Sequence, residues 1–179
     1  ETSGGFGMAT EDPQFIVNAY EDPVILKVVG RASFLNSGPI KDLFERLVGQ
    51  GKRRFVIDFD KCAGMDSTFL GIIAGLGLQM LKQNPPGAVV LCRLGDRNRE
   101  LVRNLGLHRI LIMEEEASGP TGGRAGKAEI ICADRKLTEL ENARLVLEAH
   151  ENLVELDASN KTRFQDVIAY LQSQIDDTE

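Results

Sequence analysis

The chain has 179 residues, of which 42% are hydrophobic and only 6% aromatic, so it can form a sizeable, mainly aliphatic core. Its net charge of −6 argues against general binding to nucleic acid or to an anionic membrane, because both attract basic proteins. The longest apolar run, residues 69–78, contains three glycines and is too short for a transmembrane helix of about 20 residues. Three separated cysteines and two histidines form no metal-ligand pattern, so we expect reduced thiols, no metal and no cofactor.

We expect no secretion signal at the beginning of this sequence. Residues 1–7 are rich in glycine, and neither they nor the residues after Met8 show a charged segment followed by an apolar one. We interpret Met8 as the natural start and expect a cytoplasmic protein.

Strands and helices are predicted to alternate along residues 13–113. Short apolar runs predict strands over residues 15–20, 24–29, 55–59, 88–94 and 110–113. Helical spacing and capping residues predict helices that begin at Pro39, at Asp66 or Ser67, and at Asp96. This order favours an α/β fold with a mixed sheet of four to five strands, parallel in its later part and covered by helices.

The C-terminal quarter differs from the rest in charge and pattern. Residues 134–179 hold 11 acidic and 5 basic side chains, which accounts for the whole net charge. We expect a domain over residues 8–116, a Gly-rich loop or linker over 117–135, and a helical extension over 136–179. The extension should form an antiparallel pair of amphipathic helices, with their apolar stripes against the domain, across a homodimer or on a partner.

The segment that is richest in chemical signals runs from the strand at 55–59 to the apolar helix that starts at Asp66-Ser67. Aspartate and serine are common helix caps, and such a cap alone stabilises a protein by about 1 kcal/mol. A serine at a helix N-terminus is also a favourable place for a phosphate, because free N–H groups and the helix dipole stabilise its charge. Chemistry alone leaves both interpretations open.

The same segment resembles the STAS domain, the family of anti-sigma factor antagonists and related signalling modules. The resemblance rests on Met65-Asp66-Ser67 followed by Leu70-Gly71, on the order of elements over residues 13–113, and on the Gly-Leu step at Gly106. It implies a STAS-like fold, to which the C-terminal helical hairpin is an addition.

The resemblance implies a function as well as a fold. In that family the serine is phosphorylated by a serine-kinase anti-sigma factor, and a PP2C-type phosphatase removes the phosphate. The unphosphorylated form binds the kinase. Ser67 is therefore the expected phosphorylation site, and a partner is expected to contact Ser33, Asp66, Ser67, Thr68 and Phe69. Ser33 and Phe69 replace an acidic and a small residue of many family members.

Two other functions stay open on the sequence alone. One is a STAS scaffold subunit of a transporter or sensor complex that is never phosphorylated, and the other is a small-molecule sensor. No nucleophile with a base and no acid–base pair assembles, since Asp58 and Asp60 have no evident histidine or serine partner. We therefore expect no catalytic residues and a protein that is not an enzyme.

Overall fold

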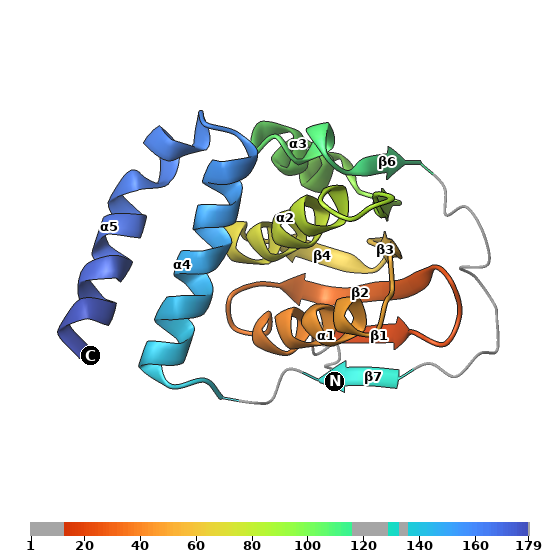
Figure 1. Ribbon diagram of the computed structural model, residues 1–179, viewed down its shortest axis with the longest axis horizontal. Coiled ribbons are helices and arrows are strands. Elements are labelled where there is room, and N and C mark those ends of the chain that lie inside the picture. The colour runs from red at the N-terminus through yellow and green to blue at the C-terminus, as the bar shows by residue number, and fades with distance from the viewer. Residues whose placement is uncertain (1–12, 116–128, 133–135, 179) are drawn as a thin grey trace, which may run out of the picture.

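The computed structural model describes residues 13–115, 129–132 and 136–178 (Figure 1). Its strands are β1 (Gln14–Asn18), β2 (Val24–Ala32), β3 (Arg54–Asp58), β4 (Cys62–Met65), β5 (Ala88–Cys92), β6 (Ile112–Glu114) and β7 (Glu129–Cys132). Its helices are α1 (Gly38–Gly49), α2 (Ser67–Leu81), α3 (Asp96–Asn104), the short 3₁₀ helix η2 (Leu107–Arg109), α4 (Glu139–Leu156) and α5 (Asn160–Thr178).

The strands form one mixed sheet in the order β6-β5-β3-β2-β1-β7, with β4 paired to β2 beside this path. β1 is antiparallel to β2 and β7, whereas β2, β3, β5 and β6 are mutually parallel. The α/β class, the mixed sheet and the added C-terminal helices are confirmed. Over the described residues the sheet has seven strands and not the expected four to five, because β4 and β7 are only four residues long and show no apolar alternation. β7 lies within the 117–135 range that was expected to be loop or linker.

A glycine divides β2 between two partners. Gly30 has a positive φ of 81°, a conformation that few other residues adopt easily, and the pairing register shifts directly after it. The first half of β2 pairs with β3, and the second half pairs with β4 through Ala32 and Met65. The sequence suggested that the strand ends at Gly30. Instead its continuation holds β4 at the position from which α2 starts.

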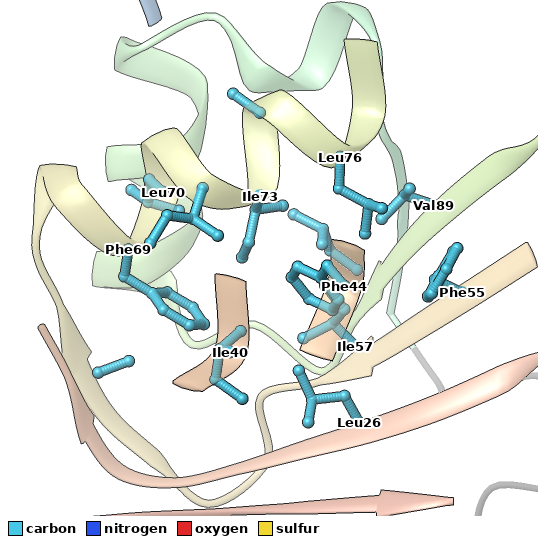
Figure 2. Close-up of a cluster of buried hydrophobic side chains, with 14 of the residues drawn as sticks. Leu26, Ile40, Phe44, Phe55, Ile57, Phe69, Leu70, Ile73, Leu76 and Val89 are labelled. Atoms are coloured by element: carbon cyan, nitrogen blue, oxygen red, sulfur yellow. The ribbon is translucent and has the colours of Figure 1, made fainter. Parts of the chain in front are cut away.

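The main core lies between the sheet and the helices α1 and α2. Figure 2 shows aliphatic and aromatic side chains from both sides of this contact, all at most 4% exposed: Leu26, Ile40, Phe44, Phe55, Ile57, Phe69, Leu70, Ile73, Leu76 and Val89. Phe15 of β1 stacks on Phe69 at 5.9 Å between ring centroids. The start of α2 is thereby fixed against the sheet by a buried aromatic pair.

The C-terminal helices form an antiparallel hairpin on the outside of α2. Helix α4 packs on α2, and α5 lies on the far side of α4 (Figure 1). Leu145, Ala149 and Leu153 of α4 join the main core, while Leu171 and Ile175 of α5 pack only in a smaller cluster with α4. The hairpin thus covers its stripes mostly within the chain, although Val167, expected on the stripe of α5, is exposed. A homodimer through these helices stays a prediction.

Candidate functional site: the start of helix α2

Ser67 is the first residue of α2, and Asp66 is its N-cap. One carboxylate oxygen of Asp66 accepts the Phe69 N–H at 3.0 Å, and the other accepts the Phe34 N–H at 2.8 Å. The Asp66 N–H donates to the carbonyl of Ala32 at 3.1 Å. Asp66 therefore joins the end of β2, the loop after it and the start of α2, and it holds Ser67 in a fixed place.

The hydroxyl of Ser67 contacts a histidine from the C-terminal hairpin. Its Oγ lies 2.8 Å from Nε2 of His150, and Nδ1 of that ring lies 2.7 Å from the carbonyl oxygen of Val146. Because a carbonyl can only accept, Nδ1 carries the hydrogen, and in the neutral imidazole Nε2 accepts from the serine. The ring is 4% exposed and meets Phe164 edge-on at 4.8 Å between centroids. The hydroxyl thus points toward α4.

Two glycines let α4 approach α2 closely beside this contact. A Cβ on Gly71 would overlap the carbonyl of Ala149, and a Cβ on Gly75 would overlap the side-chain amide of Asn152. That amide donates to the carbonyl of Gly71 at 3.1 Å. Glycine in a helix interior costs about 1 kcal/mol relative to alanine. Gly71 and Gly75 therefore lower the helix propensity of α2 but allow α4 to pack closely against it.

The model of the STAS domain family matches residues 14–118, which is more than half of the chain. The chain belongs to the STAS family. The matched range contains Asp66, Ser67 and every strand from β1 to β6, whereas the hairpin lies outside it.

Two solved structures similar to this STAS domain are those of SpoIIAA. One is described as the anti-sigma factor antagonist in its unphosphorylated form, with 15% identity over 57% of this chain and 89% of that chain, and a TM-score of 0.49. The other is the Bacillus cell fate determinant in the phosphorylated form, with 17% identity over 57% of this chain and 92% of that chain, and a TM-score of 0.47. No curated protein matches the sequence.

The five residues expected to meet a partner are not equally accessible in the STAS domain. Ser67 and Asp66 are half-buried at the surface. Thr68 and Phe69 are buried, at 4% and 0% exposure. Ser33 is buried in the loop after β2, where its hydroxyl accepts the Leu35 N–H at 3.2 Å and its backbone N–H donates to Asn36. The structure therefore gathers all five around the start of α2 but leaves only Asp66 and Ser67 within reach of solvent.

Sequence reasoning missed three residues at this site. Phe34 and Leu35 are 40% and 73% exposed, and the hydrogen bond from Phe34 to Asp66 places this apolar pair beside the start of α2. The sequence Phe-Leu directly after Ser33, in the loop that follows β2, could have indicated an apolar loop. His150 is 83 residues from Ser67 in sequence, and no local signal connects the two.

A second polar cluster lies at the ends of β3 and β5. Asp58 is buried and accepts two hydrogen bonds from Arg93, which takes a positive φ of 58°, and it also accepts the Asp60 N–H. Burial and the neighbouring Asp58 raise the pKa of the Cys92 thiol to about 11, so this sulfur stays protonated at neutral pH. Asp58 and Asp60 are thus engaged in a structural ion pair and a turn.

Within residues 13–115, 129–132 and 136–178, no group of three or more His, Cys, Asp or Glu side chains could hold a metal ion. Over the same ranges, the structure contains no helix with the length and apolarity needed to span a membrane.

Proposed function

We propose that this STAS domain is a phosphorylatable protein-interaction module in bacterial signalling, of the anti-sigma factor antagonist type. When Ser67 is unphosphorylated, it binds a serine-kinase anti-sigma factor, and a PP2C-type phosphatase resets the phosphorylated form. The chain itself catalyses no reaction in this scheme. The single observation that carries the proposal is the position of Ser67, the residue that the family resemblance marks, as the first residue of α2.

The physical chemistry of that position supports a switch. A phosphate adds a charge of about −1.5 to −2. At the first turn of α2 the unpaired N–H groups and the helix dipole would stabilise this charge, so the fold need not melt. The exposed side chains of Phe34 and Leu35 lie beside it and offer apolar contact to a partner. A dianion at the edge of such a contact would weaken binding by several kcal/mol, on the order of what unpaired interfacial charges cost.

The experiment starts with the full chain isolated from its native host under kinase-active conditions. Phosphosite mass spectrometry is expected to find phosphate on Ser67. Ser67→Ala and Ser67→Asp proteins then serve as baits, with Ser173→Ala and Ser173→Asp as the matched pair on the exposed face of α5. We expect the alanine variant of Ser67 to retain a serine kinase and the aspartate variant to lose it by about tenfold or more. Both Ser173 variants should behave like the unaltered protein. Phosphate found only at other residues, or equal retention by both Ser67 variants, overturns the proposal.

A second candidate function is a STAS scaffold subunit of a transporter or sensor complex that is not phosphorylated. The hydrogen bond between the Ser67 hydroxyl and buried His150 favours it, because this serine already has an internal structural role. This candidate predicts the same partner on both Ser67 variants and no phosphate at Ser67 in the native protein.

A further inference from the structure

The surface around Ser67 already has an occupant, which is helix α4 of the same chain. His150 lies over the Ser67 hydroxyl, Ala149 lies over Gly71, and Asn152 lies over Gly75. These three residues follow one another along the face of α4 that rests on the first three turns of α2. The start of α2 is thus fitted to receive a helix that carries a small residue and an amide at this spacing.

Further interactions hold the hairpin to the domain, among them the hydrogen bond from Asn160 to the carbonyl of Leu105 and the ion pair of Arg109 with Asp157. Leu145 and Leu153 are the large buried side chains of α4 in the main core. Two ion pairs, Lys41 with Glu148 and Lys82 with Glu155, are partly or largely exposed at 3.4 Å, and such pairs contribute little. The hairpin pairs with no described strand, so its release would leave the hydrogen bonds between the described strands in place.

Phosphate on Ser67 removes a contact of this docked arrangement. Phosphorylation replaces the hydrogen that Nε2 of the neutral His150 ring accepts, so the present hydrogen bond between the two helices is lost. The new dianion would also lie against a helix that contains five glutamates and one arginine. Loss of this part-buried hydrogen bond and like-charge repulsion both act to separate α4 from α2.

We propose that α4 is an internal competitor for the partner-binding surface at Ser67, and that the α4–α5 hairpin must leave α2 before a partner can reach that surface. The partner contributes a helix of similar chemistry, with a small residue opposite Gly71. Phosphate on Ser67 then excludes α4 and the partner alike. The inference rests on the function proposed above, because it assigns a regulatory element to the same serine.

The first test measures access to position 67 without any kinase. Ser67→Cys is introduced, and its alkylation by iodoacetamide is followed at the peptide that contains residue 67. The same rate is measured after adding Gly71→Ala, which places a methyl group against the backbone of α4, or Gly49→Ala, whose Cβ meets nothing within 4 Å. We expect alkylation to be about tenfold faster with Gly71→Ala and unchanged with Gly49→Ala.

Asn152→Ala provides the second variant, in case Gly71→Ala does not fold. It removes the hydrogen bond to the Gly71 carbonyl and leaves α2 unaltered, so alkylation at position 67 should again accelerate. If the introduced thiol reacts at the rate of an unfolded peptide without any second substitution, or if neither Gly71→Ala nor Asn152→Ala changes its rate, the hairpin does not cover the site and the inference is wrong.

The second test uses the full chain with phosphoserine incorporated at position 67 during translation. Hydrogen exchange is compared with that of the unmodified chain. We expect faster exchange over α4 and α5 and unchanged exchange over β2, β3 and β5. Unchanged or slower exchange in α4 would mean that the phosphate pairs with His150 and holds the hairpin closed, which overturns the inference. Neither test requires a kinase, so their failure leaves the proposed function standing, whereas absence of Ser67 phosphate in the native protein refutes the function without affecting these results.

Discussion

The two faces of α2 make contacts of different kinds. Toward the sheet, Phe69, Ile73 and Leu76 interlock with large side chains of the strands and α1 (Figure 2). Toward α4, glycines let two backbones approach, and the hydrogen bonds of Ser67 to His150 and of Asn152 to Gly71 supply much of the specificity. Burial of large apolar side chains dominates the first contact, while shape and polar groups contribute more to the second. The difference shows that one face of a helix can stay buried in the core while its other face exchanges one packed helix for another.

The largest expected loss of stability comes from truncating one buried side chain on each side of α2, one in the sheet and one in α4. Ile57 of β3 and Leu153 of α4 are both fully buried, so Ile57→Ala and Leu153→Ala should each cost about 2–5 kcal/mol. Ile57→Ala should lower the stability of the whole domain. Leu153→Ala should mainly accelerate hydrogen exchange in α4 and α5, because its side chain belongs to the hairpin.

Denaturant unfolding and hydrogen exchange by mass spectrometry together separate the two results. Tyr170→Ala is the control, since that side chain of α5 is exposed and its loss should change neither measurement. Equal acceleration of exchange in β3 and α4 by Leu153→Ala would show that the hairpin and the sheet unfold as one unit.

A smaller effect is expected at the tip of the hairpin. The side-chain amide of Asn160 is fully buried and donates to the carbonyls of Leu105 at 2.9 Å and Leu153 at 2.8 Å. Asn160→Ala leaves both carbonyls without this donor and should lower the free energy of unfolding by about 2 kcal/mol. The exposed amide of Gln165 on α5 is the control, because Gln165→Ala should have almost no effect. A loss as small as that of the control would mean that other groups or water satisfy these carbonyls.

The smallest effect depends on pH. Hydrogen bonds from the hydroxyl and N–H of Ser159, together with the nearby Arg109, lower the pKa of Asp157 from its ordinary value of 3.8. A carboxyl whose pKa is lowered by folding stabilises the folded form above its ordinary pKa, and this contribution is lost as the pH falls through the lowered pKa. Asp157→Asn should therefore be less stable than the unaltered protein at pH 7, and the gap should narrow as the pH falls below about 4.

Denaturant melts of both proteins at several pH values between 2 and 7 measure this gap. Asp166→Asn on the exposed face of α5 is the matched control. A gap between Asp157→Asn and the unaltered protein that is constant with pH would show that the Asp157 charge does not stabilise the tip of the hairpin.

Much of the fold could be predicted from the sequence, because its signals are local. Pro39 at the start of α1, Asp66 before α2 and the aliphatic runs of β2, β3 and β5 each determine an element from neighbouring residues. β4 and β7 were not predicted, because the four residues of each strand show no apolar alternation. Long-range pairing with β2 and β1 forms them, and no window of the sequence contains that information.

The candidate site was only partly predictable for the same reason. Asp66 and Ser67 were identified by a cap signal and a family resemblance, both of which are local. The interaction with His150 joins residues that lie in different elements 83 positions apart. The glycines of α2 did suggest a close neighbour, but they could not indicate that this neighbour is α4. The burial of Thr68 and Phe69 follows from the rotation of α2 on the sheet, which only the packed structure defines.

The hydrogen bonds of His150 allow the docked hairpin to be detected by ¹⁵N NMR. Donation from Nδ1 to Val146 fixes one tautomer of the ring, and the two nitrogens of a fixed tautomer resonate far apart in an ¹⁵N spectrum. The chain has only two histidines, His108 and His150, so such a spectrum contains two imidazole patterns at most for each state. Undocking of α4 would remove the Ser67 hydroxyl from Nε2 but leave the bond from Nδ1 to Val146 within the same helix, so the Nε2 resonance should shift more than that of Nδ1. The ¹⁵N resonances of His150 therefore report whether α4 is docked on α2, and no dye or spin label is required.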